Sequence, residues 1–302
     1  MNSRPPVSST DVVAVIITHR GQGAMLRRCL ESVDAAGGVA GVIVVDNSDR
    51  PTDASSGYGP GVTDVVRMPN RGFGAAANRG IERARAAVDP DATLWVAVLN
   101  DDVVVTAGWL APLRAAMATS ERVGAVQPKL LFAGTRPALV NSVGVRLDDS
   151  GAGVDIGVGE PDGPEWGEVS EIEMFTGGAV LLRDAFLEDL RGFDERYFLY
   201  YEDVDLALRG AARGWRFICE PSSVVLHEGS VTTSQLGDEV RRLQDRNRLW
   251  IAFRFGSFGS VRSAVWLSVR RLRHPPRAAH ARGLLGGLIA APRLLAERHR
   301  DR

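Results

Sequence analysis

The sequence predicts an α/β protein in which a mostly parallel sheet is flanked by helices and followed by a basic helical extension. Short apolar runs rich in β-branched residues alternate with amphipathic segments over the first 120 residues, which is typical of a parallel sheet with helices on both faces. From about residue 235 the composition changes to Arg-rich segments with helical periodicity. A chain of 302 residues with 45% apolar residues is long enough to bury a large core.

The elements follow in a regular order. Apolar runs predict four strands, at 12–20, 39–49, 62–70 and 92–105. Helical spacing of apolar residues predicts helices between and after them, at 23–38, 72–88 and 108–120. Residues 133–172 are rich in Gly, Pro and Asp, and we expect loops and short strands there.

Polar residues stand where the predicted strands end, at Thr18, Asp46, Asn47, Asp49, Asn100, Asp101 and Asp102. Ligands of open α/β sheets bind at the carboxyl ends of the strands. Adjacent carboxylates such as Asp101 and Asp102 repel each other unless a cation lies beside them, and their oxygens suit Mg²⁺ or Mn²⁺. The alternative is a turn in which Asn and Asp bond the backbone.

A second acidic cluster lies within 192–217, where Glu202, Asp203 and Asp205 open an amphipathic helix after an aromatic run. Carboxylates at a helix N-terminus are favourable in themselves, so capping is the alternative to a role as general base for a hydroxyl group. His227 follows at the end of another apolar run. It is a candidate metal ligand, although a single His is more often structural.

The stretch from Gly72 to Ala77 fits the glycine-rich fingerprint of dinucleotide-binding proteins. That fingerprint belongs after the first strand of the sheet, whereas these glycines follow the third. One alternative is a turn that packs a helix closely on the sheet. We favour another, a helix start whose amides and Asn side chains face a nucleotide sugar.

Composition limits the compartment and the partners. Two cysteines, Cys29 and Cys219, cannot form a disulfide framework, and we find no signal peptide and no apolar run of transmembrane length. We therefore expect a cytoplasmic protein. The whole chain has 36 basic and 37 acidic residues. From Arg241 onward it has 15 Arg and three acidic residues, so the preceding part is acidic and the tail is basic.

This basic tail suggests a partner with negative charge. Val261, Val265, Val269 and Leu272 recur at helical spacing among arginines, as in helices that lie on a membrane surface. The alternative is a helix that packs on the α/β domain and exposes its basic face. Nucleic acid is excluded as the expected partner, because few aromatic residues are interleaved for base stacking.

Six stretches occur together in one order: "VVAVIITHR", "VIVVDNSD", "NRGFGAAANRGI", "VLNDDVVV", "TGGAVLLRDAFLEDLRGFDERYFLYYEDVDLALR" and "VLHEGS". Over roughly residues 11 to 230 the chain thereby resembles the family-2 glycosyltransferases of the GT-A fold. It is most similar to the rhamnosyltransferase-like enzymes of bacterial cell-wall and polysaccharide assembly. The resemblance implies a GT-A nucleotide-sugar transferase domain at 11–234. Outside it, the sequence predicts a disordered N-terminal tail at 1–10 and basic amphipathic helices at 235–302.

The resemblance also implies roles for residues. Asp203, with Glu202 beside it, would be the catalytic base, and Asp102 and His227 would bind Mg²⁺ or Mn²⁺. Thr176, Gly177 and Gly178 would border the acceptor. The donor site would comprise Thr18, Asp46, Asp49, Asn70, Gly72, Asn78, Asn100 and Asp101. Asn100 stands where the family's D-x-D motif has its first Asp.

The implied reaction is an inverting, metal-dependent transfer of a sugar, with rhamnose favoured, from a dTDP- or UDP-sugar. The implied acceptor is a hydroxyl group of a glycan or of a polyprenyl-linked sugar, which would bring the basic tail to the inner membrane surface. The alternatives are a non-catalytic nucleotide-sugar or glycan-binding module and a sugar nucleotidyltransferase.

Overall fold

The fold is built on one mixed sheet, described by a computed structural model for residues 10–18, 23–48, 58–59, 61–228 and 231–298. Its main strand order is β10-β12-β6-β11-β4-β1-β2-β3, with β5 paired to β12 and β7 paired to β6. The expected α/β class is confirmed. The expected tail at 1–10 lies almost wholly outside the described residues, and so does Asp49.

The first half of the sheet is parallel, as the alternation of strands and helices predicts. Strands β1, β2, β3 and β4 pair in parallel, with Thr18 opposite Asp46 and Ile17 opposite Asn100. The elements of this half are β1 (Thr10–Thr18), α1 (Ala24–Ala36), β2 (Gly41–Asp46), β3 (Val62–Arg67), α2 (Phe73–Ala87), β4 (Thr93–Asn100), β5 (Val103–Val105) and α3 (Leu110–Ala118). Thr18, Asp46 and Asn100, the last residues of β1, β2 and β4, therefore meet at one edge, because the carboxyl ends of parallel strands coincide.

The second half departs from the parallel pattern. Strand β11 runs antiparallel to both β4 and β6, whereas β12 runs parallel to β6. Its elements are β6 (Val123–Phe132), β7 (Val140–Ser142), β8 (Val145–Leu147), β9 (Gly153–Asp155), η2 (Pro164–Trp166), β10 (Ser170–Ile172), β11 (Ala179–Arg183), α4 (Asp184–Leu190), η3 (Glu195–Tyr197), α5 (Glu202–Ala212) and β12 (Arg216–His227). The short strands within 133–172 match the prediction for that region.

The predicted strand at 92–105 is two strands. A turn at Asp101 and Asp102 ends β4 and turns the chain, so that β5 pairs with β12 instead of continuing along β1. As a result, Asp102 and His227 come close together, because Val103 pairs with His227 across this new ladder.

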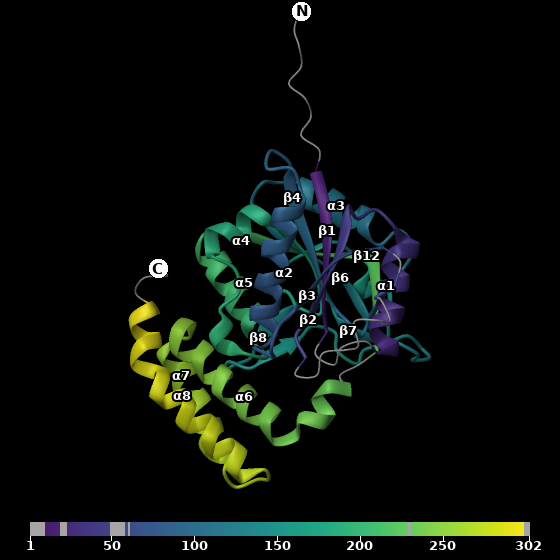
Figure 1. Cartoon of the computed structure of the whole chain (residues 1–302). Coiled ribbons are helices and arrows are strands. Elements are labelled where there is room, and N and C mark those ends of the chain that lie inside the picture. The colour runs from purple at the N-terminus through teal and green to yellow at the C-terminus, as the bar shows by residue number, and fades with distance from the viewer. Residues whose placement is uncertain (1–9, 19–22, 49–57, 60, 229–230, 299–302) are drawn as a thin grey trace, which may run out of the picture.

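Helices cover both faces of the sheet (Figure 1). Along β1, Val13, Val15 and Ile17 pack in the core beneath α2, α4 and α5, and the alternate residues pack in the core beneath α1 and α3. The strand is therefore apolar without alternation because both of its faces are buried. The two cysteines are buried and free, as expected.

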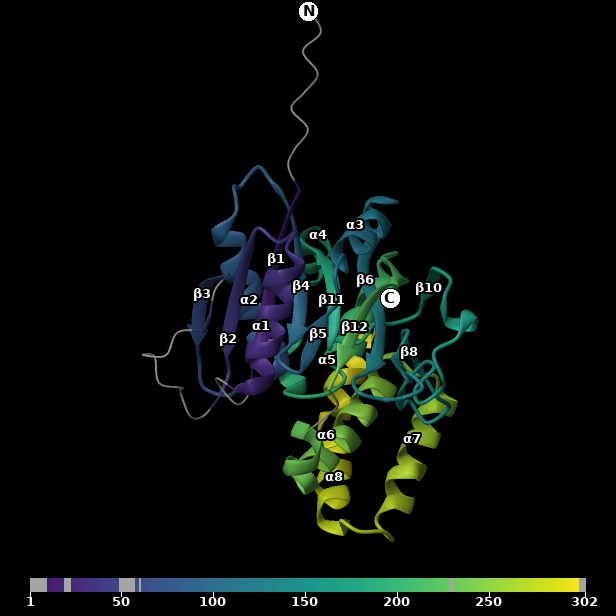
Figure 2. The same ribbon diagram turned by 90° about the vertical axis from the view of Figure 1, so that its right-hand side faces the viewer.

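The basic extension forms three helices, α6 (Val231–Phe255), α7 (Phe258–Arg271) and α8 (Arg277–Arg298). Figures 1 and 2 show them grouped below the sheet, at the end opposite the start of β1. Helix α8 approaches α6 closely at Gly283 and Gly287, where an added Cβ would lie 2.8 Å from the Asp245 side chain and 2.4 Å from that of Leu249. Among the described residues no helix is both long enough and apolar enough to cross a membrane.

The predicted apolar stripe of α7 is divided between two environments. Val261 and Val265 pack against the core, where α7 contacts α6 and α8, so this part of the stripe is covered by the extension itself. Val269 is 50% exposed, together with Phe258 at 84% and Trp266 at 57%. The exposed apolar surface of α7 is thus carried partly by residues that the sequence pattern did not single out.

Candidate active site

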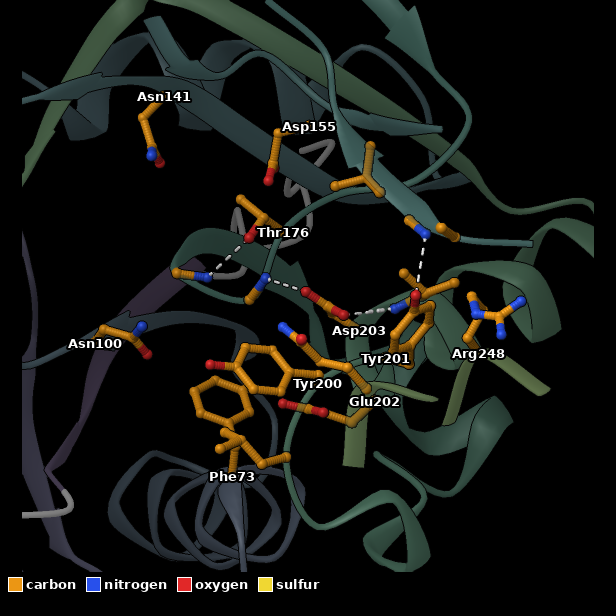
Figure 3. A pocket seen from close by; sticks show the side chains of 18 of the residues that line it. Phe73, Asn100, Asn141, Asp155, Thr176, Tyr200, Tyr201, Glu202, Asp203 and Arg248 are labelled. Carbon is orange, nitrogen blue, oxygen red and sulfur yellow. Dashed lines mark hydrogen bonds between the residues drawn. The ribbon is translucent and has the colours of Figure 1, made fainter. Parts of the chain in front are cut away.

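A cavity of about 480 Å³ opens where the sheet, the loop before α5 and the helical extension meet. Its lining contains every predicted metal, base and acceptor residue and part of the predicted donor set: Asn100, Asp101, Asp102, Thr176, Gly177, Gly178, Glu202, Asp203 and His227. Figure 3 shows Asn100, Thr176, Glu202 and Asp203 around this cavity. Residues more than 120 positions apart in the sequence are therefore brought together.

The Thr176–Gly178 segment joins the two acidic clusters. The Gly178 carbonyl accepts a hydrogen bond of 3.0 Å from the Asn100 amide, and the Gly177 amide donates one of 2.8 Å to Oδ2 of Asp203. An added Cβ on Gly177 would lie 3.1 Å from the Phe73 ring. This segment thus holds Asp203 at a fixed position relative to the end of β4.

Asp102 and His227 form a pair that fits a divalent cation. Oδ1 of Asp102 is buried without a hydrogen bond and lies 3.3 Å from Nε2 of His227, whose Nδ1 lies 3.1 Å from Oδ1 of Asn141. When His227 donates Nδ1–H to Asn141, the lone pair of Nε2 faces the carboxylate, an arrangement that a cation between them stabilises.

The spacing of the pair agrees with this assignment. Two neighbouring ligands about 2.1 Å from one octahedral ion lie about 3.0 Å apart. No cluster of three His, Cys, Asp or Glu side chains suitable for a metal occurs in the described part of the chain. Asp102 and His227 would therefore supply two ligands, and a bound diphosphate and water would complete the coordination.

The two carboxyl groups at the start of α5 differ in environment. Burial raises the pKa of Glu202 to about 8, and the Asp203 charge adds to the rise. Burial also raises the pKa of Asp203, whereas the hydrogen bonds that its carboxylate accepts from the backbone amides of Gly177 and Val204 oppose the rise. Oε2 of Glu202 is buried without a partner, which favours the neutral acid, so Asp203 is the better candidate for the ionised member of the pair.

Helix capping accounts for part of this cluster, because Oδ1 of Asp203 accepts a hydrogen bond of 2.8 Å from the first-turn amide of Val204. The N-cap position of α5 is Tyr201, and no side chain caps the helix there. Asp205, in contrast, is buried in ion pairs of 2.7 Å with Arg209 and 2.8 Å with Arg254. Asp205 is therefore structural, and Glu202 and Asp203 face the cavity.

The loop before α5 has an unusual backbone held by the helical extension. Phe198, Tyr200 and Tyr201 all have positive φ angles, between 67° and 71°. The amide of buried Asn247, on α6, donates to the carbonyls of Tyr197, Leu199 and Tyr200 at 3.0, 2.9 and 2.8 Å. These bonds hold in place the segment that carries Glu202 and Asp203.

Some of the predicted donor residues line the cavity and others do not. Thr18 and Asp46 are buried at the carboxyl ends of β1 and β2, and Oδ2 of Asp46 accepts a hydrogen bond of 3.1 Å from Tyr58. Neither residue lines the cavity that contains Asn100 and Asp101. They lie at the same edge of the sheet as Asn100, through the pairing of β1 with both neighbours.

Asn70, Gly72 and Asn78 are engaged with the protein itself. Oδ1 of Asn70 accepts from the Gly72 amide at 3.1 Å, and Asn78 bonds both the amide and the carbonyl of Phe193 at 2.8 and 2.9 Å. Within the described residues these contacts give Asn78 a structural role rather than a place in the cavity.

The start of α2 does not match the favoured interpretation of an open anion site. Its first amide, on Phe73, donates to the Phe198 carbonyl at 2.7 Å. An added Cβ on Gly72, where φ is 90°, would lie 2.0 Å from that same carbonyl oxygen. The glycine is needed because the loop before α5 lies directly on the helix start, so the close contact is with this loop, whereas the alternative named the sheet.

Sequence reasoning missed several residues of the cavity. Asp155, at the end of β9, lines it, and burial raises the pKa of this carboxyl group to about 6. Asn141, on β7, orients His227. Both lie in the region predicted as loops and short strands, where nothing in the sequence distinguishes Asp155 from its acidic neighbours. Arg241, Arg248 and Arg271 come from the helical extension.

Comparisons with known proteins agree on one family. The family model described as "Glycosyl transferase family 2" matches residues 14–134, and the model "Glycosyl transferase family group 2" matches residues 95–292. The N-acetylglucosaminyl-diphospho-decaprenol L-rhamnosyltransferase of Mycobacterium tuberculosis is 31% identical over 250 residues, which are 75% of this chain and 79% of that protein. The O-antigen biosynthesis protein RfbC of Myxococcus xanthus is 28% identical over 76% of this chain and 18% of its own length.

Solved structures with this fold include two glycosyltransferases. The structure of GalNAc-T7 with UDP, GalNAc and Mn²⁺ has a TM-score of 0.66 at 14% identity, over 98% of this chain and 58% of that one. The mannosyltransferase PcManGT from Pyrobaculum calidifontis, in complex with GDP-Man and Mn²⁺, has a TM-score of 0.55 at 16% identity, over 99% and 87%. These likenesses confirm the expected GT-A fold.

The raised pKa of Glu202 predicts how stability depends on pH. The folded protein keeps this carboxyl group protonated up to about pH 8, whereas its ordinary pKa is 4.5. Between these values folding retains a proton that the unfolded chain loses, so rising pH destabilises the wild type by up to about 1.4 kcal/mol per pH unit. The stability of Glu202→Gln relative to wild type should therefore increase from pH 5 to pH 8 and then level off, as measured by urea denaturation.

The matched control is Glu168→Gln, at an exposed position outside the cavity. Its stability should follow the wild type across the same range. A constant difference between Glu202→Gln and wild type from pH 5 to pH 8 would contradict the protonated state of Glu202.

Proposed function

The chain belongs to glycosyltransferase family 2, and we propose that it transfers a sugar from a nucleoside diphosphate donor to a hydroxyl group of a lipid-linked glycan, with inversion at the anomeric carbon. One observation carries this proposal. Asp203 and the Asp102–His227 pair line one cavity, and the Thr176–Gly178 segment bonds both acidic clusters. A base for the acceptor and a site for the leaving diphosphate thus occupy the same space.

The proposed chemistry is a single displacement. The acceptor hydroxyl group attacks C1 of the donor sugar, its proton passes to Asp203, and the bond from C1 to the diphosphate oxygen breaks. A divalent cation held by Asp102 and His227 would neutralise the leaving diphosphate. The raised pKa of Asp203 makes this carboxylate a stronger base than an ordinary aspartate. Hydrogen bonds from two backbone amides fix the orientation of its side chain.

The sugar and the acceptor are proposed from the mycobacterial relative. Its name specifies rhamnosyl transfer to an N-acetylglucosaminyl-diphospho lipid, and the Myxococcus relative belongs to O-antigen biosynthesis. We propose rhamnose as the sugar, a dTDP- or UDP-linked donor, and a polyprenyl diphosphate-linked acceptor of cell-wall or polysaccharide assembly. Thr18, Asp46, Asp49, Asn100 and Asp101 remain the proposed residues of the donor site, and Thr176, Gly177 and Gly178 border the acceptor.

A membrane surface agrees with such an acceptor, and the outer faces of α7 and α8 have suitable chemistry. Exposed apolar side chains recur at helical spacing on each helix, at Phe258, Trp266 and Val269 and at Leu285, Leu288, Ile289 and Leu295. Exposed arginines accompany them, among them Arg262, Arg270 and Arg282. We propose that these faces contact anionic lipid, because apolar residues flanked by arginines bind the headgroup region of such membranes.

Asp203→Asn tests the base. The amide keeps the shape of the side chain but cannot accept the proton, so we expect kcat to fall by about 10²- to 10⁴-fold while the Kd of the nucleotide changes less than twofold. Asp149→Asn, at an exposed position away from the cavity, should behave as the wild type. Transfer at the wild-type rate by Asp203→Asn would reject the assignment of the base.

Asp102→Ala tests the metal site. The variant should bind UDP or dTDP at least tenfold more weakly than the wild type in Mn²⁺, because it loses a charged ligand of the cation. In EDTA the two proteins should bind these nucleotides equally weakly in titration calorimetry, and Asp149→Ala should match the wild type in both buffers. Equal affinities of Asp102→Ala and wild type in Mn²⁺ would remove Asp102 from the metal site.

Vesicle flotation tests the lipid contact. Trp266→Ser with Ile289→Ser removes two exposed apolar side chains, each of which would contribute about 1.5–3 kcal/mol if it became buried. The double variant should bind phosphatidylglycerol-containing vesicles at least tenfold more weakly than the wild type. The control Val158→Ser with Val169→Ser changes two side chains, 49% and 59% exposed, outside the extension. Equal binding by the two double variants would refute the proposed surface.

A further inference from the structure

The wall of the cavity that comes from the helical extension is basic. Arg241, Gln244 and Arg248 line it from α6 at positions i, i+3 and i+7, a spacing that places them on one helix face. Arg271, the last residue of α7, also lines the cavity. We name Arg241, Arg248 and Arg271 the arginine wall. The remaining lining contains Asp101, Asp102, Asp155, Glu202 and Asp203, so the cavity has an acidic and a basic side.

Arg248 is a buried cation that forms no direct ion pair with a carboxylate among the described residues, although the charges of Asp245 and Asp148 act on it from nearby. Its side chain is fully buried, and its terminal nitrogens donate to the Ser150 and Ala264 carbonyls and to the Ser268 hydroxyl, at 2.9, 3.1 and 2.6 Å. Its Nε is buried without a hydrogen bond. Burying a charge in this way is unfavourable, and an anion that enters the cavity would offset the cost.

The other two arginines differ in their partners. Arg271 pairs with the buried carboxylate of Asp245, which also lies 2.5 Å from Nδ1 of His280, so Arg271 is anchored to α6 and α8. Arg241 is exposed, and in the described part of the chain it forms neither an ion pair nor a hydrogen bond. Arg241 is therefore available to a ligand, and its replacement disturbs no contact within the described structure.

Arg248 lies apart from Asn100, which stands two residues before Asp102 in the sequence. In Figure 3, Asn100 and Arg248 stand at opposite sides of the cavity, with Asp203 and Tyr201 between them. A donor whose diphosphate occupies the Asp102 side leaves the arginine wall to a second anionic group. Asp203 then lies between the two sites, where a base that acts on the acceptor hydroxyl group has to be.

From this placement we propose that the arginine wall binds the diphosphate group of a polyprenyl diphosphate-linked acceptor sugar. The inference rests on the proposed function, since it assumes that the acceptor carries this group. Guanidinium groups suit it because they bond two phosphate oxygens at once. The arginines also attract an anionic acceptor into a cavity whose other carboxylates would repel it.

The test measures binding directly and needs no sugar transfer. Geranyl diphosphate is titrated into wild type, Arg241→Gln and Arg27→Gln in EDTA, with geraniol as the uncharged probe. Arg27 is the matched control, because it is an exposed arginine of α1 that lies outside the helical extension and does not line the cavity. We expect Arg241→Gln to weaken geranyl diphosphate binding about tenfold, the effect of losing one charged hydrogen bond. Arg27→Gln should match the wild type, and geraniol binding should be unchanged throughout.

Two results would overturn the inference. One is equal binding of geranyl diphosphate by Arg241→Gln and Arg27→Gln. The other is a loss of UDP or dTDP affinity by Arg241→Gln in Mn²⁺ that is as large as its loss of geranyl diphosphate affinity. That result would place Arg241 in the donor site. Failure of the proposed function has a different signature: the wild type then transfers no sugar from any nucleotide donor, whereas its binding of geranyl diphosphate still depends on Arg241.

Discussion

The geometry of the active site depends on one amide group. Asn247 donates to three carbonyls of the loop before α5, and Arg246 fixes this amide by donating to its oxygen at 2.8 Å. The loop includes three non-glycine residues with positive φ, a backbone that costs about 1–3 kcal/mol per residue and persists only where its surroundings enforce it. Since α6 supplies these contacts, the helical extension is a structural part of the site.

The second feature of the site is the balance of charge among the groups that line the cavity. Five carboxyl groups line the cavity, and carboxylates in a poorly hydrated space repel one another. Burial raises the pKa of Glu202 to about 8 and that of Asp155 to about 6, which lowers the negative charge. The proposed cation at Asp102 and the arginines from the extension would act in the same direction, so both would favour the binding of anionic substrates.

Much of the fold and part of the site could be predicted from the sequence. The strands β1, β2 and β4, and the acids that follow β2 and β4, have local signatures, because an apolar run that ends in polar residues marks the carboxyl end of a buried strand. Asp102, Asp203 and His227 stood out because charged or titratable side chains next to buried strands and helix starts require an explanation. All three line the cavity.

Only the tertiary structure decided the remainder. Asp155 and Asn141 lie in short strands without a distinctive pattern, and their place in the site depends on pairing with distant segments. Asn78, predicted in the donor site, bonds Phe193, which is 115 residues away. In the sequence, Arg248 cannot be told from the other arginines of a basic helix. Only the position of α6 beside the cavity makes it a lining residue. The sequence by itself determined which segments form strands and helices, because that pattern is local; contacts between distant segments determined which side chains meet.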